Sequence, residues 1–155
     1  RAQREDAGMS PQQTLSQVAD GLLNQWREPI EAKGLALIFE PGHPANTCYN
    51  ATLLHAVMGN LLRNALHYTE RGFIRLTLTT SGFMVEDSGV GIPEEKREAM
   101  FEPFVRGNEK RGEGLGLGLS LVQRICENQG WSVILTTMEP NGCRFQVQFN
   151  TSNVN

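Results

Sequence analysis

Three stretches of the chain place their apolar side chains at the three- and four-residue spacing of an amphipathic helix. They predict helices over residues 12 to about 33, 51 to about 68 and about 116–129. Pro29 lies inside the first stretch and has no N–H to donate, so we expect the last turns to be kinked or to form a separate turn. Asn50 directly precedes the second stretch and is expected to cap that helix.

Further segments are predicted as strands because they are short, largely apolar and bounded by turn residues. Segment 143–149 alternates between apolar and polar side chains, which indicates one buried and one solvated face. Tight turns are expected at 81–82 and at the Pro-Asn-Gly sequence 140–142. The predicted strands span residues 35–40, 73–79, 83–86, 131–138 and 143–149.

The order of these elements predicts an α+β fold, a two-layer α/β sandwich. We expect a mixed, mostly antiparallel sheet of about five strands, with the three main helices on one face. A short helix is predicted over 94–100. Residues 101–115 have no sustained period and are rich in glycine and charge, so no regular element is predicted there.

Length and composition limit the classes of protein to consider. The chain has 155 residues, about one domain, and 39% of them are hydrophobic, which is enough for a core. A net charge of −3 argues against a generally basic nucleic-acid-binding protein. The apolar runs fall far short of the roughly 20 residues of a membrane span, so we expect a soluble chain without membrane contact. Because it starts at Arg1, we expect a piece of a longer or processed protein.

The cysteines and histidines are too scattered for a disulfide framework or a zinc motif. We expect buried free thiols and no structural metal. These residues are Cys48, Cys126, Cys143, His43, His55 and His67.

Four segments carry candidate chemistry, and the first is Asn-Leu-Leu-Arg-Asn-Ala-Leu-His-Tyr-Thr at 60–69. Asn60 and Asn64 are four residues apart, so their amides are expected on the same helical face. An Asn oxygen can bind a hard cation such as Mg²⁺, which proteins usually hold with one or two oxygens plus phosphates and waters. The alternative is that both residues simply mark the solvated face of an amphipathic helix.

The second segment is Val-Glu-Asp-Ser-Gly-Val-Gly-Ile-Pro at 85–93. Asp87 follows a predicted strand, and a carboxylate there can accept from an amino group such as that on the edge of adenine. Gly89 and Gly91 would let the backbone approach a ligand closely. An ordinary Asp-Gly turn is the alternative.

The third and fourth segments are Phe-Glu-Pro-Phe-Val-Arg-Gly at 101–107 and Gly-Glu-Gly-Leu-Gly-Leu-Gly-Leu at 112–119. Alternate glycines leave backbone N–H groups free to approach phosphate, and the following helix adds its positive N-terminal end. Arg106, Lys110 and Arg111 add cationic side chains. The segments match neither a P-loop nor a dinucleotide fingerprint, so a flexible linker is the alternative.

In this order the four segments resemble the N, G1, F and G2 boxes of the ATP-binding catalytic domain (HATPase_c, Bergerat or GHKL fold) of bacterial sensor histidine kinases. The resemblance covers about 35–149. This family shares its nucleotide fold with the ATPase modules of gyrase, a heat-shock chaperone and mismatch-repair proteins. The resemblance implies ATP and Mg²⁺ as cofactors and a mobile ATP lid. It also implies a catalytic domain over 12–150, a linker remnant over 1–11 and a C-terminal tail over 151–155.

The resemblance also implies roles for individual residues. Asn64 would bind magnesium, and Asn60 would lie beside it near the phosphates. Tyr68 would stack near the adenine, Asp87 would accept its amino group, and Arg106 would reach the terminal phosphates. Asn60, Asn64 and Arg106 would thus be the catalytic residues. Phe101 and Phe104 would anchor the lid. The other implied nucleotide-binding residues are His67, Gly89, Gly91, Ile92, Lys110, Arg111, Gly112, Gly114, Leu115, Gly116 and Leu117.

Two positions depart from the family pattern. His67 stands where the family commonly has Lys, and its shorter, mostly neutral side chain is expected to help phosphate binding less. Gly118 stands where the family often has Ser or Ala, a change that we expect to matter little.

The resemblance implies transfer of the γ-phosphoryl group to a histidine on a separate dimerisation and phosphoacceptor domain, for onward signalling to a response regulator receiver domain. No histidine here has the His-Glu/Asp-x-Arg/Lys-Thr/Ser-Pro context of such a site. The hydrolytic relatives have Glu where this chain has Asn60, and an amide cannot act as a general base, so transfer is favoured over hydrolysis.

The same resemblance implies a cytoplasmic domain, monomeric when isolated, of a parent protein anchored in the bacterial inner membrane. Two alternatives stay open. One is a degenerate nucleotide-sensing or docking module without phosphotransfer, which His67 favours. The other is a serine kinase of the anti-sigma type, which shares the nucleotide fold.

Overall fold

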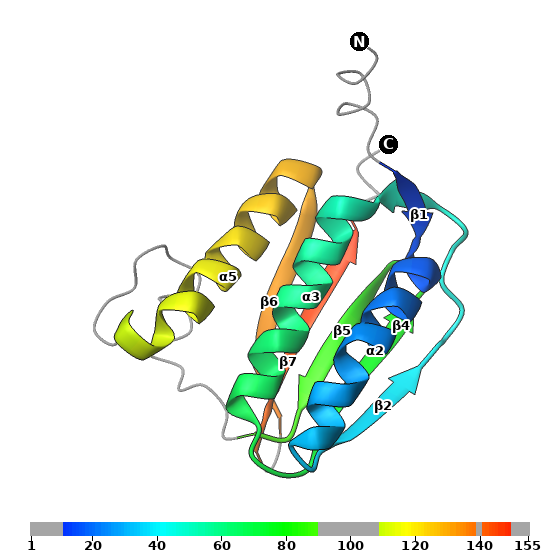
Figure 1. Cartoon of the computed structure of the whole chain (residues 1–155). Helices are drawn as coiled ribbons and strands as arrows, with labels where there is room; N and C mark the ends of the chain where they lie inside the picture. Colours follow the sequence, from blue (N-terminus) through cyan, green and yellow to red (C-terminus); the bar gives the residue numbers. More distant parts are fainter. Residues whose placement is uncertain (1–10, 90–108, 139–140, 150–155) are drawn as a thin grey trace.

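The computed structural model describes residues 11–89, 109–138 and 141–149, with the side chains of 109–117 left out. Its helices α2 (Leu15–Ala32), α3 (Ala51–Tyr68) and α5 (Glu109–Gln129) form one layer over a five-stranded sheet, which confirms the predicted α+β sandwich (Figure 1). The strands lie in the order β2-β4-β5-β7-β6. Their bounds are β2 Ala36–Glu40, β4 Phe73–Thr79, β5 Gly82–Asp87, β6 Trp131–Thr137 and β7 Cys143–Phe149.

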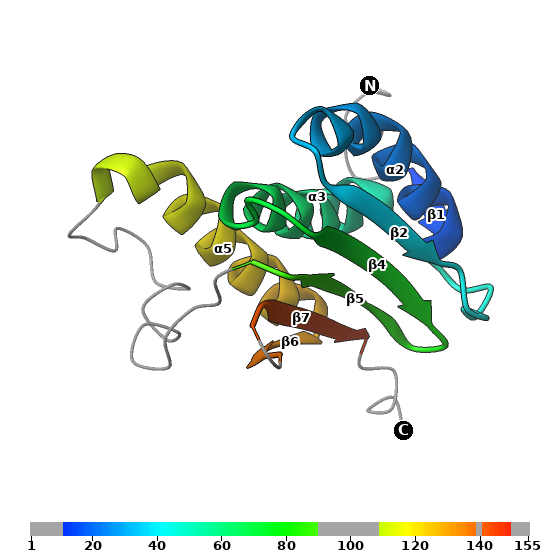
Figure 2. The ribbon, with the colours of Figure 1, turned by 90° about the horizontal axis from the view of Figure 1, so that it is seen from below.

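The sheet is mixed, as predicted: β2 pairs with β4 in parallel, and the other neighbours are antiparallel. Figure 2 shows all three helices on the same face. On that face the strands bury alternate side chains such as Ile74, Leu76 and Leu78, which pack in the core. We call the opposite face, which no described helix covers, the open face.

Helix α2 begins later than predicted. Residues 12–14 form a short strand, β1 (Gln12–Thr14), which pairs antiparallel with β3 (Cys48–Asn50). The helix starts at Leu15 because Thr14 caps it: its hydroxyl accepts from the Gln17 N–H, and the Gln17 side chain accepts from the Thr14 N–H. Pro29 does not split off a separate last turn, and the helix continues to Ala32.

Helix α3 lies between α2 and α5 and crosses the middle of the sheet (Figures 1 and 2). Its bounds agree with the prediction, and the Asn50 side chain accepts from the Leu53 N–H at 3.0 Å as the expected N-cap. Its inner face is almost fully buried because it contacts both the sheet and its neighbouring helices. The buried apolar residues of that face are Leu54, Val57, Met58, Leu61, Leu62 and Ala65.

Helix α5 begins at Glu109 rather than at about 116, so residues 109–115 were wrongly predicted to be irregular. Each glycine in a helix costs about 1 kcal/mol relative to alanine, which argued against a helix there. The Glu, Lys, Arg and Leu residues between the glycines are strong helix formers and favour the opposite outcome. The predicted helix over 94–100 and residues 101–108 lie outside the described residues.

The cysteines are only partly as expected. Cys126 and Cys143 are buried free thiols, but Cys48 is exposed because it lies on the short ribbon that β1 and β3 form beside the main sheet. Among the described helices, none is both long and apolar enough to cross a membrane.

Candidate functional site

Three elements meet at the end of the sheet where β5 ends. The carbonyl end of α3, the end of β5 and the backbone that follows it lie in direct contact, and α5 packs along α3 beside them (Figure 1). A Cβ placed on Gly89 would come within 2.4 Å of the Tyr68 carbonyl oxygen. The first and second predicted segments are therefore brought together, as expected of one site.

Asp87 is the central acidic group of this site and is almost fully buried. The Gly89 N–H donates to its Oδ1 at 2.8 Å, and the Cys143 N–H also donates to the carboxylate. Burial raises the pKa of Asp87, although these two hydrogen bonds and the nearby Thr69 hydroxyl oppose the shift. The carboxylate therefore sits in a desolvated position with acceptor capacity beyond these two donors.

Gly89 has a structural role that the sequence did not predict. The sequence led us to expect that it lets the backbone approach a ligand; in addition, the described backbone at Gly89 contacts the end of α3. Any side chain at this position would overlap the Tyr68 carbonyl, and would also come within 3.0 Å of the Thr69 hydroxyl oxygen. The glycine thus lets the segment after β5 close against α3.

Asn60 and Asn64 lie one turn apart on α3, but their surroundings differ. Asn64 is buried, and its Oδ1 has no hydrogen-bond partner among the described residues. Asn60 is partly exposed: its Nδ2 donates to the Ala56 carbonyl at 2.7 Å, and its Oδ1 accepts from Arg63 Nη2 at 3.0 Å. A buried amide oxygen without a donor is suited to a hard cation, whereas the Asn60 amide is already bonded along its own helix.

His67 and Tyr68 end the helix with their rings edge to face, the centroids 5.1 Å apart and the planes at 90°. His67 is exposed, and Tyr68 is partly buried. Burial raises the pKa of the Tyr68 phenol, so this side chain stays neutral at physiological pH. The Tyr68 carbonyl lies against Gly89, so this aromatic end of α3 adjoins the segment that follows Asp87.

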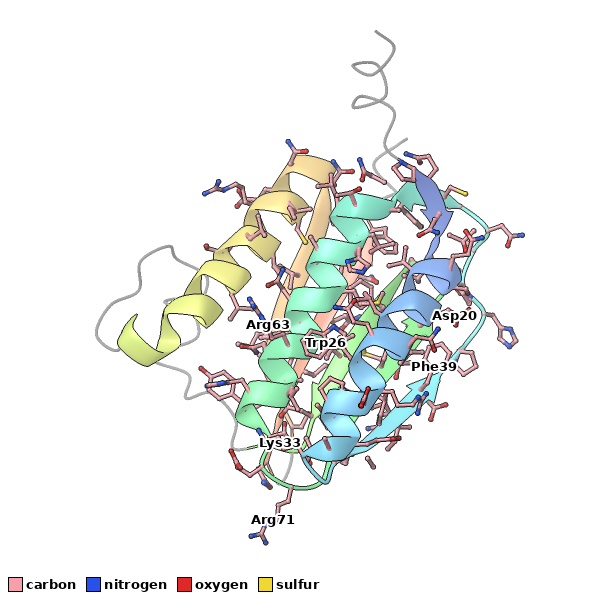
Figure 3. The ribbon with its side chains drawn as sticks, in the orientation of Figure 1. Asp20, Trp26, Lys33, Phe39, Arg63 and Arg71 are labelled. Carbon is pink, nitrogen blue, oxygen red and sulfur yellow. The ribbon has the colours of Figure 1, made fainter. Side chains whose placement is uncertain are left out.

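The sequence did not single out three further residues at this site. Thr69 is fully buried beside Asp87, and its hydroxyl makes no hydrogen bond of ordinary geometry within the described residues. Ser88 Oγ accepts from the Phe73 N–H at 2.9 Å and holds the segment after β5 against β4. Lys33 donates from Nζ to the Leu66 carbonyl at 2.6 Å and so caps the end of α3 (Figure 3). Thr69 directly follows the predicted helix and could have been noticed, but Lys33 is too far away in sequence to give a local signal.

The remaining predicted binding residues are described only in part. Gly112, Gly114 and Gly116 belong to the backbone of α5, together with Lys110, Arg111, Leu115 and Leu117, whose side chains are not described. The others lie outside the described residues: Gly91, Ile92, Phe101, Phe104 and Arg106.

Residues 49–153 match the family model described as histidine kinase-, DNA gyrase B- and HSP90-like ATPase. Among curated proteins, the chain is 42% identical over 100 residues to the sensor protein RstB of Escherichia coli, covering 60% of this chain and 23% of RstB. It is 34% identical over 136 residues to the sensor histidine kinase GtrS of Pseudomonas aeruginosa, covering 86% of this chain and 27% of GtrS. The chain therefore spans less than a third of these relatives.

Solved structures share the fold. The nucleotide-free catalytic domain of histidine kinase ThkA superposes with a TM-score of 0.79 and 26% identity, covering 90% of this chain and 93% of that domain. Full-length ShkA in complex with AMPPNP superposes with a TM-score of 0.78 at 22% identity, covering 90% of this chain and 31% of ShkA.

Proposed function

This chain belongs to the histidine kinase-, DNA gyrase B- and HSP90-like ATPase family, and from that premise we propose that it is the catalytic domain of a longer sensor histidine kinase. It binds Mg-ATP and transfers the γ-phosphoryl group to a histidine on a separate phosphoacceptor domain. A bond forms between the imidazole nitrogen and the γ-phosphorus, the bond to the β,γ-bridging oxygen breaks, and ADP leaves. The phosphoryl group then passes to the receiver domain of a response regulator.

The observation that supports this function best is the position of Asp87. Its buried carboxylate lies beside the aromatic end of α3 and keeps acceptor capacity after the N–H groups of Gly89 and Cys143 are counted. An adenine stacked near Tyr68 would offer its amino group to this carboxylate. Guanine has a carbonyl at the same place and would meet the carboxylate acceptor to acceptor, so the site favours ATP over GTP.

Asn64 is our candidate for the magnesium ligand. Its Oδ1 is buried and without a partner among the described residues, which is costly unless a cation or a donor satisfies it. Mg²⁺ would supply neutralisation of phosphate charge at this position. The chain's own contribution is to hold the amide oxygen in place, because Asn64 lies on the buried face of α3 with Leu61 and Ala65.

We assign the phosphate contacts to Arg106, Lys110 and the glycines 112, 114 and 116. The N-terminus of α5 supports this assignment, because helix N-termini carry unpaired N–H groups and partial positive charge. Catalysis would depend on positioning and on charge neutralisation, which are the main contributions in phosphoryl transfer. Asn60 cannot remove a proton from water, so the chain favours transfer to an imidazole over hydrolysis.

A second candidate, a nucleotide-sensing module without phosphotransfer, is favoured by one observation. His67 is exposed and occupies the position where the family commonly has Lys, which would leave less fixed positive charge near the phosphates. We place the kinase first because the buried carboxylate of Asp87 and the buried amide of Asn64, whose Oδ1 has no partner among the described residues, both support nucleotide binding. We propose a cytoplasmic location for this domain, a membrane-anchored parent and a monomeric state for the isolated chain.

The test mixes the chain with the helical phosphoacceptor domain of its parent and with ATP labelled in the γ-phosphate. Label on the acceptor histidine, lost when that histidine is changed to Gln, is the expected result. Labelled free phosphate in its place would assign the chain to the hydrolytic relatives. ATP binding without transfer to the acceptor or to water would assign it to the sensing modules.

A further inference from the structure

Thr69 places a fully buried hydroxyl at the end of α3. The residue directly follows the helix and has extended backbone, with φ −108° and ψ 115°. Its Oγ1 is buried and makes no hydrogen bond of ordinary geometry among the described residues. The Gly89 backbone closes over it, since a Cβ placed on Gly89 would lie 3.0 Å from Thr69 Oγ1. Because a buried hydroxyl without a partner is costly, an acceptor beside it is of interest.

That acceptor is the buried carboxylate of Asp87. The Thr69 hydroxyl is one of the groups that oppose the rise in the pKa of Asp87, so it lies close enough to favour the ionised form. The other two are the N–H groups of Gly89 and Cys143, which the backbone holds in place. Figure 1 shows how the segments converge: α3 ends at the edge of the sheet where β5 ends and β7 begins, and Asp87 is paired with Cys143 across the two strands. A buried donor without a partner therefore lies beside a buried acceptor with spare capacity.

We propose that Thr69 is a positioning residue for base recognition: its hydroxyl completes the set of donors that orient the Asp87 carboxylate toward the amino group of adenine. The proposal rests on the function proposed above, in which Asp87 accepts from that amino group. The two backbone donors fix the place of the carboxylate, whereas the hydroxyl hydrogen can turn toward the oxygen that the base leaves free. Thr69 thus acts through Asp87 and does not itself touch the nucleotide.

The first test removes the hydroxyl and keeps the shape of the side chain. Thr69→Val puts a methyl group in its place, and the extended backbone at this position suits a β-branched residue. We expect the Kd for ATP to rise about three- to tenfold, the effect of one ordinary hydrogen bond, while the thermal stability stays equal or rises because an unpartnered hydroxyl has left the interior. Thr69→Ser keeps the hydroxyl and should bind ATP as the unaltered chain does. Thr52→Val is the matched control: it makes the same change at an exposed position near the start of α3 and should alter neither quantity.

A nucleotide without the amino group separates positioning from general damage. Purine riboside triphosphate has a hydrogen atom where ATP has the amino group, so it offers Asp87 nothing to accept. Its Kd should therefore agree within about twofold between Thr69→Val and the unaltered chain, and the nucleotide serves as the second change of a double-mutant cycle. Calorimetric titration of both chains with both nucleotides measures the four affinities.

Two outcomes would overturn the positioning role. An equal loss of ATP affinity in Thr69→Val and Thr69→Ser would assign the effect to packing of the methyl group, and an equal loss for both nucleotides would assign it to a damaged site. Thr69→Ser and Thr69→Ala differ only in the hydroxyl, so comparing these two variants gives the same answer if Thr69→Val folds poorly. Failure of the unaltered chain to bind ATP would overturn the proposed function, whereas equally tight ATP binding by the unaltered chain and Thr69→Val would overturn this inference alone.

Discussion

Glu86 and Asp87 are neighbours on β5, yet their carboxylates lie on opposite faces of the sheet. Asp87 faces the helices and the candidate site, whereas Glu86 lies on the open face between two arginines. Arg75 of β4 donates from Nε to one carboxylate oxygen at 2.8 Å, and Arg144 of β7 donates from Nε to the other at 2.9 Å. Glu86 thereby joins the two strands that flank β5 directly beside the residue assigned to adenine recognition.

The surroundings shift the pKa values of the two carboxyl groups in opposite directions. Burial alone would raise the pKa of Glu86, but the hydrogen bonds and charges of Arg75 and Arg144 outweigh it and hold that pKa below its ordinary value. Asp87 has no cation beside it among the described residues, and burial raises its pKa. Glu86 therefore stabilises the fold when ionised, and Asp87 costs stability when ionised.

Replacing Glu86 with Gln should destabilise the protein in a pH-dependent way. A lowered native pKa means that the contribution is fully present above the ordinary value of 4.5 and is lost as the pH falls below it. Because the arginines are about a third exposed, we expect a loss of about 1–3 kcal/mol at pH 7 from the broken charged hydrogen bonds. Urea unfolding of both proteins at pH 7 and at pH 3.5 measures the difference.

The matched control for Glu86 is Glu28→Gln, which removes the same charge from an exposed position on α2. The free energy of unfolding of this variant should lie within about 0.5 kcal/mol of that of the unaltered chain at either pH. If the difference between the unaltered chain and Glu86→Gln stayed constant from pH 7 to 3.5, the ionised carboxylate would not be its source.

Replacing Asp87 with Asn should weaken ATP binding without weakening the fold. The raised native pKa means that ionisation above the ordinary value of 3.8 lowers stability, so the neutral amide should be at least as stable at pH 7. Its oxygen can still accept from the Gly89 N–H. The lost acceptor should reduce ATP affinity roughly tenfold or more. Calorimetric titration measures the affinity for ATP, and thermal unfolding measures the stability of the variant. Equal affinities of the unaltered chain for ATP and GTP would contradict the assignment of Asp87 to adenine recognition.

Lys33→Met should loosen the end of α3. Lys33 Nζ donates to the Leu66 carbonyl at 2.6 Å and lies 3.7 Å from Glu70, and Met keeps most of the aliphatic chain while removing the donor. We expect a loss of about 1–2 kcal/mol of unfolding free energy and faster amide exchange over 64–69. Arg27→Met is the control, because its ion pair with Glu31 is about half exposed and should contribute about 0.5 kcal/mol or less.

The thiols should differ in reactivity under native conditions. Cys48 is exposed, whereas Cys126 and Cys143 are buried, and burial raises the pKa of the Cys126 thiol to about 12. A thiol reagent at pH 8 should therefore modify Cys48 quickly and the other two only after unfolding. Mass spectrometry of the labelled peptides identifies the site, and rapid native labelling of Cys126 would contradict its burial.

Residues 106–114 should respond to the nucleotide. If Arg106, Lys110 and the glycine amides bind phosphate as proposed, hydrogen exchange across this range should slow with Mg-ATP and less with Mg-ADP. Arg106→Ala should reduce phosphotransfer more than it reduces ATP affinity, because the proposed contact is with the transferred group. If the exchange rates over 106–114 were the same with and without nucleotide, these residues would be a linker and not a phosphate-binding segment.

Local patterns were sufficient for much of the fold. Helix α3 was predicted with its bounds and its Asn50 cap, because the apolar spacing and the capping residue are both contained in one short stretch. The same holds for β4 and β7, whose alternation of apolar and polar residues directly reflects one buried and one solvated face. The order of the four candidate segments was likewise readable, since each is contiguous.

Long-range contacts decided what those patterns could not. Residues 12–14 pair with residues 48–50, and no local signal encodes a partner so far away in sequence. The buried carboxylate of Glu86 is paired by Arg75, 11 residues before it, and by Arg144, 58 residues after it. The four-residue spacing of Asn60 and Asn64 predicts that they share one face of α3, but it does not predict their surroundings. The backbone of α5 lies against Asn60 at Gly118, whereas Asn64 is buried and its Oδ1 has no partner among the described residues. Periodicity specifies which face a side chain occupies, and only the packed tertiary structure decides which groups, if any, meet it there.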